Sequence, residues 1–87
     1  MWHRTSRRTE DTYRKTAAAR LRRVPTPEVL DWADLAGTGV AKALQDYRKD
    51  GQTESLLEAR NALSSMCGAL DVVEERDPGI QRRNEFG

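Results

Sequence analysis

The chain is short and highly charged, which limits what it can be. Its 87 residues are 37% hydrophobic and 33% charged. This length predicts one small domain, and the apolar content argues against a wholly disordered chain. A single cysteine and a single histidine exclude an intramolecular disulfide and a zinc site built from cysteine and histidine.

Charge is distributed unevenly along the chain. Residues 1–23 carry eight basic and two acidic side chains, a formal charge of +6, whereas residues 24–77 carry five basic and eleven acidic ones, a formal charge of −6. A basic arm joined to an acidic body predicts a partner that is recognised by charge. The candidate contact residues are Arg4, Arg7, Arg8, Arg14, Lys15, Arg20, Arg22 and Arg23.

Two kinds of partner suit this arm. Clustered arginines bind the phosphates of nucleic acids and release counterions. The same side chains also pair with carboxylates, here those of the chain's own acidic body or of a second copy. Because an acidic body repels a phosphate backbone, we expect the arm's main contact to be protein, with nucleic acid as the alternative.

The arm, residues 1–24, is expected to be helical from about residue 10 to residue 23. Thr9 is the predicted N-cap, followed by Glu10 and Asp11 in the first turn, where the helix dipole favours negative charge. Pro25 disfavours helical geometry at the residue before it, so the helix should end there.

The second predicted helix begins at Thr26-Pro27, where a threonine N-cap precedes a proline at the first helical position. It ends at Asp50-Gly51, since glycine commonly follows a helix C-terminus. At 100° per residue, one face of this helix collects apolar side chains. The core or interface residues predicted on it are Val29, Trp32, Ala36, Val40 and Tyr47.

The third predicted helix begins near Ser55, with Ser55 and Glu58 as a capping box, and ends before Asp77. Apolar residues from Leu56 to Val73 recur in alternating steps of three and four, which is heptad spacing. The core or interface residues predicted here are Leu56, Leu63, Met66 and Leu70.

The short connection at Gly51 predicts an antiparallel helical hairpin over residues 27–77, with Leu63 and Val40 buried between its helices. Two helices cannot enclose both apolar stripes. The fold class expected is therefore all-α: a hairpin plus a basic N-terminal helix, completed into a helical bundle by a symmetric dimer. Residues 78–87 are expected to be a flexible tail. The sequence does not show whether residues 84–87 are native, and no conclusion is drawn from them.

The segment 31–37 (Asp-Trp-Ala-Asp-Leu-Ala-Gly) resembles the start of a helix-turn-helix of the lac-repressor type, in which a small residue and a glycine four places on mark the turn. Over residues 31–49 the resemblance implies a recognition helix that exposes Lys42, Gln45 and Arg48. Thr38 and Asp46 depart from the apolar or buried residues of that family. The apolar stripe also keeps its phase from Val29 to Tyr47, which favours one continuous helix.

Small side chains cover much of the second helix, namely Ala33, Ala36, Gly37, Gly39, Ala41 and Ala43, and Ser64 and Gly68 give the third helix a similar patch. Small residues let helix backbones approach closely, so we expect a tight interface within the hairpin or between copies. Leu30, Leu35, Leu57 and Val72 lie off both stripes and are expected to form a second contact surface.

Enzyme chemistry has little support. Cys67 lies on an apolar face without a nearby histidine, and no glycine-rich phosphate loop follows a strand. We therefore expect no catalytic residue, no metal and no cofactor. The lone cysteine favours a reducing compartment, and neither a signal peptide nor a membrane span is recognisable, so a cytoplasmic location is expected.

These features predict a small, non-enzymatic helical module for protein–protein interaction. Self-association and an unidentified protein partner are expected. A regulatory or accessory role is expected only by analogy with small phage-encoded proteins, which have a similar size and simple architecture. The alternative is a small DNA-binding regulator that uses the basic arm and the helix-turn-helix-like segment at 31–49.

Overall fold

Three helices make up most of the described structure. The computed structural model describes the backbone of residues 2–80 and the side chains of residues 9–80. Helix α1 spans Trp2–Leu21, α2 spans Thr26–Asp50 and α3 spans Thr53–Arg76. No strand occurs among residues 2–80, so the predicted all-α class is confirmed.

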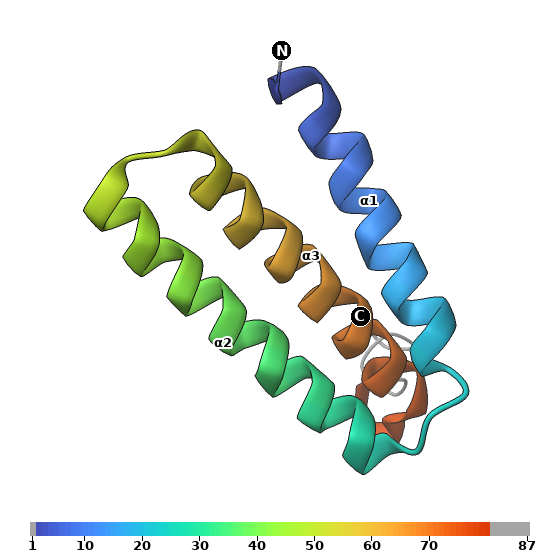
Figure 1. Ribbon diagram of the computed structural model, residues 1–87. Coiled ribbons are helices and arrows are strands. Elements are labelled where there is room, and N and C mark those ends of the chain that lie inside the picture. The colour runs from blue at the N-terminus through green and yellow to red at the C-terminus, as the bar shows by residue number, and fades with distance from the viewer. Residues whose placement is uncertain (1, 81–87) are drawn as a thin grey trace.

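Helix α3 lies between the other two helices (Figure 1). It contacts both α1 and α2. Helices α1 and α3 run in the same direction and α2 runs in the opposite one, while α1 and α2 diverge from the loop that joins them. As a result, α3 uses two opposite sides for packing, and its remaining two sides face away from both neighbours.

Two predicted helix starts are wrong. Helix α1 begins at Trp2 rather than near Glu10, so Thr9 lies inside the helix and is not its N-cap. Helix α3 begins at Thr53 with Gln52 as N-cap, so the Ser55 capping box is not formed. The Asp50 carboxylate organises this turn instead, accepting from the Gln52 N–H at 2.9 Å and from the Ser55 hydroxyl at 3.5 Å.

The predicted end of the second helix is confirmed. Gly51 adopts a left-handed conformation with φ 62°, and its N–H donates to the Tyr47 carbonyl at 2.8 Å. A side chain would be strained in this conformation, so glycine is the residue that lets the chain reverse between α2 and α3.

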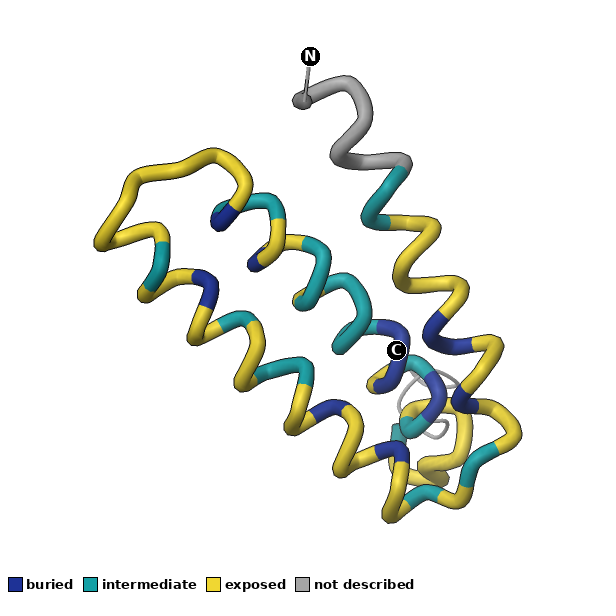
Figure 2. Tube along the Cα trace, viewed as in Figure 1, coloured by how far each residue is buried: buried dark blue, intermediate teal, exposed yellow. Residues whose placement is uncertain are grey.

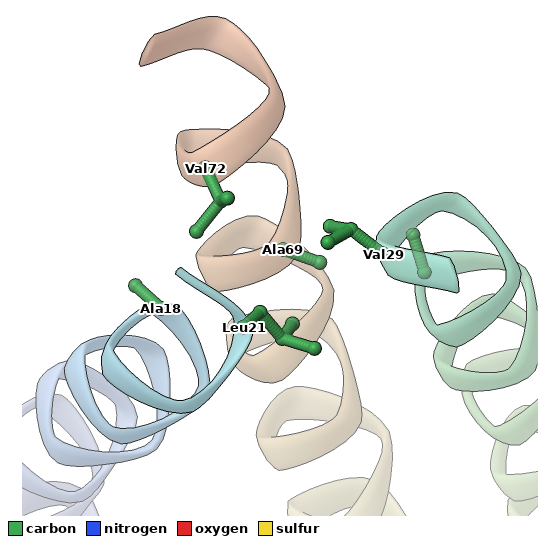
Figure 3. Close-up of a cluster of buried hydrophobic side chains, with 6 residues drawn as sticks. Ala18, Leu21, Val29, Ala69 and Val72 are labelled. Atoms are coloured by element: carbon green, nitrogen blue, oxygen red, sulfur yellow. The ribbon is translucent and has the colours of Figure 1, made fainter. Parts of the chain in front are cut away.

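The core sits where the three helices meet, near the loop from α1 to α2 (Figure 2). Ala18 and Leu21 of α1, Val29 of α2, and Ala69 and Val72 of α3 converge there (Figure 3). Val29 and Val72 are the largest side chains that are fully buried. The core of a single chain is therefore small and consists mainly of alanine and valine.

Several larger side chains predicted for the core lie outside it. Val29 is buried as predicted, and Ala36, Val40, Leu56 and Met66 are half-buried. In contrast, Trp32, Tyr47, Leu63 and Leu70 remain 38–50% exposed. The prediction that Leu63 is buried within the hairpin is wrong for one chain. The reason is that α3 packs on two sides through smaller residues such as Ala59 and Ala69, which leaves the heptad leucines between its two contact faces.

The predicted arm, residues 1–24, contains α1, and the predicted segment 27–77 contains most of α2 and all of α3. Residues 81–87, which make up most of the predicted tail, lie outside the described residues.

Candidate interaction surface

Charged side chains join the arm, residues 1–24, to α3 in three places. The Arg14 guanidinium donates two hydrogen bonds of 2.7 Å to the Asp71 carboxylate. Arg22 donates to both carboxylate oxygens of Glu75, at 3.1 and 2.7 Å. Arg60 of α3 pairs with Glu10 of α1. Part of the basic arm is therefore neutralised by the acidic body of the same chain.

These pairs change the proton affinity of their carboxylates. The hydrogen bonds from Arg14 lower the pKa of Asp71 below its ordinary value of 3.8. The hydrogen bonds from Arg22 likewise lower the pKa of Glu75 below 4.5. Asp71 is half-buried, whereas Arg14 and Glu75 are exposed. Solvent therefore screens both pairs, and each contributes little stability.

Arg76 fastens the end of α3 to the loop between α1 and α2. Its guanidinium donates to the carbonyls of Leu21, Arg22 and Val24 and to the Thr26 hydroxyl, at 2.9–3.5 Å. Leu21 is the last residue of α1, and Arg22 and Val24 lie in the loop that follows it, so the cation of Arg76 sits at the C-terminus of α1, where the helix dipole favours positive charge. The role of Arg76 was not predicted, because it depends on a contact more than fifty residues away in the sequence.

The other basic residues of the arm are not seen to pair with carboxylates of the acidic body among the side chains that the structure describes. Lys15, Arg20 and Arg23 are exposed and make no ion pair among residues 9–80. The side chains of Arg4, Arg7 and Arg8 lie outside the described residues. The expected contact between arm and body is thus present for Arg14 and Arg22, and nothing in the structure assigns a nucleic-acid contact to the others.

Gly68 permits close contact between α1 and α3. A Cβ atom at this position would lie 2.4 Å from the Arg14 carbonyl oxygen and 3.0 Å from the Ala17 Cβ. The predicted small-residue patch of the third helix therefore forms a tight interface, but with α1 rather than within the hairpin or between copies. Val72, expected to lie on a second surface, is fully buried in the core shared with α1.

Exposed leucines line one side of the α2–α3 pair. Leu30 and Leu44 of α2 are 45% and 44% exposed, and Leu63 and Leu70 of α3 are 50% and 40% exposed. We call these four residues the leucine face. Members of each row share a helix face because they are separated by multiples of seven residues. Gly37, midway between Leu30 and Leu44, lies beside Met66 of α3, so the two rows are neighbours.

The opposite side of the molecule carries a hollow that we call the aromatic groove. Its lining includes Tyr13, Ala17, Arg20 and Leu21 of α1, Trp32 of α2 and Ser65 of α3. Trp32 and Ser65 each follow a leucine-face residue by two positions, and helix residues two apart point in opposite directions. The leucine face and the aromatic groove are therefore separate surfaces.

The helix-turn-helix-like segment is not a turn. Helix α2 continues without interruption from Thr26 to Asp50, so no separate recognition helix begins at Thr38. The phase of the apolar stripe pointed to this outcome. The Gly37 and Gly39 positions instead face α3, where they approach Met66 and Ala62.

No family model, curated protein or solved structure matches this chain. In the part of the chain that the structure describes, no cluster of three or more His, Cys, Asp or Glu side chains could hold a metal ion. None of its helices combines the length and the apolar character that crossing a membrane requires.

Proposed function

We propose that this protein is a non-enzymatic helical module for protein–protein interaction, and that its first partner is a second copy of itself. The observation that supports the proposal is that the buried side chains are small, whereas large apolar side chains are exposed. The core holds mostly alanine and valine, while four leucines on one face remain about half exposed. Large apolar side chains gathered on one side of a small protein mark an interaction site.

The pattern of the leucine face favours a symmetric pair. On α2, Leu30 and Leu44 each lie seven residues from Gly37; on α3, the half-buried Leu56 and the exposed Leu70 each lie seven residues from Leu63. Both rows therefore read the same in either direction. A two-fold rotation about their centre exchanges the ends of each row, and symmetric dimers pair the same surface patch on both subunits.

The centres of the two rows also lie at nearly the same level. Gly37 lies beside Met66, which is less than one turn of α3 from Leu63. One axis can thus pass through both centres, and Gly37 leaves room for a helix of the second copy. In this arrangement two α2–α3 pairs form a four-helix body, and α1 flanks it on each outer side.

The charges of the arm support protein rather than nucleic acid as the partner. Arg14 and Arg22 are already bound to Asp71 and Glu75, and the helix-turn-helix-like segment lacks its turn. Regulation or accessory function through a further protein is consistent with this proposal, but the leucine face itself is assigned to the second copy.

Sedimentation equilibrium of the intact chain tests the proposal. We expect a species of twice the 9.9 kDa chain mass, with dissociation upon dilution. A single 9.9 kDa species at micromolar and higher concentration would contradict it. Strong binding of duplex DNA that weakens steeply with salt would favour a nucleic-acid function instead.

A further inference from the structure

The aromatic groove brings together two rings from different helices. Tyr13 of α1 is 44% exposed and Trp32 of α2 is 38% exposed, and both line a cavity of about 360 Å³. Ala17 and Leu21 add apolar wall, and the small Ser65 side chain of α3 leaves space between the rings. This volume lies near the lower end of the range for sites that bind small organic molecules, about 300–1,000 Å³.

The charged side chain that lines the groove is positive. Arg20 lines the cavity, whereas no aspartate or glutamate does. Two other arginines of the arm, Arg14 and Arg22, are bound to carboxylates of α3. Arg20 makes no ion pair among residues 9–80. A guanidinium presents several N–H donors in one plane and suits a carboxylate, sulfonate or phosphate group.

We propose that the aromatic groove binds a small aromatic anion. The flat body of the ligand would lie against Tyr13 and Trp32, and its acidic group would pair with Arg20. Aromatic rings contribute large contact areas and favourable offset or edge-on geometries, while the guanidinium selects charge. This site lies on the opposite side from the leucine face and does not require that face to be an interface.

A matched pair of dyes tests the site. The probes are 8-anilinonaphthalene-1-sulfonate, an aromatic anion, and N-phenyl-1-naphthylamine, which has the same aromatic body without the sulfonate. A Trp2→Phe background makes Trp32 the only tryptophan, so loss of its emission by energy transfer reports a dye bound near the groove. We expect the anionic dye to bind more tightly than the neutral dye, so that it quenches Trp32 emission at lower dye concentrations.

Substitution of Arg20 separates charge recognition from general apolar binding. Arg20→Gln should lower the affinity of the protein for the anionic dye roughly tenfold to a hundredfold, which is the effect of losing one charged hydrogen-bond donor. Its affinity for the neutral dye should stay unchanged. Arg23→Gln is the matched control and should change neither affinity. Circular dichroism checks that each variant is folded.

Three results would overturn the proposal. One is an Arg20→Gln variant that binds the anionic dye as tightly as the parent protein does. Another is equal affinity of the parent protein for both dyes. The third is quenching that disappears in Leu63→Asp but persists in Trp32-containing Arg20→Gln protein, because the dye would then occupy the leucine face.

Discussion

Gly68 shows how a single missing side chain positions an entire helix. A methyl group at this position would lie 2.4 Å from the Arg14 carbonyl oxygen, and that oxygen belongs to the backbone of α1. The helix could accept the methyl group only by moving away from α3. Gly39 offers a contrast, because a Cβ there would meet the Ala62 Cβ at 3.8 Å, an ordinary contact distance.

The first prediction compares alanine at these two glycines. Gly68→Ala should lower the free energy of unfolding by about 1–3 kcal/mol, because overpacking outweighs the gain in helix propensity. Gly39→Ala should raise it by about 1 kcal/mol, the propensity difference between glycine and alanine. Urea denaturation followed by circular dichroism measures both. A Gly68→Ala protein as stable as Gly39→Ala would mean that α1 does not pack on α3 as described.

The second prediction concerns Arg76, which donates to three backbone carbonyls and one hydroxyl around the α1–α2 loop. Arg76→Ala should destabilise the protein by about 1–3 kcal/mol, since it removes several hydrogen bonds from one charged donor. Arg23→Ala removes an exposed arginine without such bonds and should change stability by less than about 0.5 kcal/mol. Equal effects in urea denaturation would contradict this role of Arg76.

The third prediction is the pH dependence of the Arg14–Asp71 pair. Because the pKa of Asp71 is lowered in the folded chain, its contribution to stability is present above the ordinary pKa of 3.8 and is lost as pH falls through the lowered value. Asp71→Asn should cost about 0.5–1 kcal/mol at neutral pH, given that Arg14 is exposed. This difference should shrink below pH 3.8. Asp31→Asn serves as the exposed control, and a constant difference at all pH values would contradict the pair.

At the scale of the helices, local signals in the sequence were reliable where the relevant contact is local. Gly51 ends α2 as predicted, because its left-handed geometry depends only on adjacent residues. The continuity of α2 through Gly37 followed from the phase of its apolar stripe. The starts of α1 and α3 were wrong because weak capping signals compete with helix propensity and with the Asp50 turn.

The faces of α3 could not be read from its heptad alone. The spacing of Leu56, Leu63 and Leu70 suggested one packing side, but the helix has two neighbours. The contacts of Gly68 and Val72 with α1 depend on how the arm folds back, which no residue pattern within α3 specifies. The sequence therefore predicted Leu63 and Leu70 of the leucine face, but it placed Leu30 off both stripes and did not include Leu44 among the predicted core or interface residues, and it did not show which of these residues one chain leaves exposed.

The fourth prediction addresses the role of α1. Ala17, Ala18 and Leu21 are buried against the rest of the chain, so deleting residues 1–24 should expose Val72 and Ala69 and lower the melting temperature or abolish cooperative unfolding. Differential scanning calorimetry of the two chains measures this effect. An unchanged transition, together with loss of duplex DNA binding on deletion, would show that the arm serves nucleic acid rather than the fold.

At the scale of the whole molecule, one chain encloses too little of its apolar surface. Val29 and Val72 are the largest fully buried side chains, while tryptophan, tyrosine and leucine side chains are exposed on two sides. The aromatic groove holds part of this surface next to Arg20. The leucine face holds another part, in a pattern that repeats under a two-fold rotation, and a second copy of the chain would cover it.

Sedimentation equilibrium of Leu63→Asp and Leu35→Asp shows whether two copies pair through the leucine face. Leu63 lies at the centre of the leucine face, whereas Leu35 is 70% exposed and lies outside it. Leu63→Asp should give a folded 9.9 kDa monomer, because an unpaired charge in the interface costs several kcal/mol on pairing but remains in water in the single chain. Leu35→Asp should remain dimeric, as should the parent protein. A dimeric Leu63→Asp protein, or equal dissociation of both variants, would contradict pairing through the leucine face.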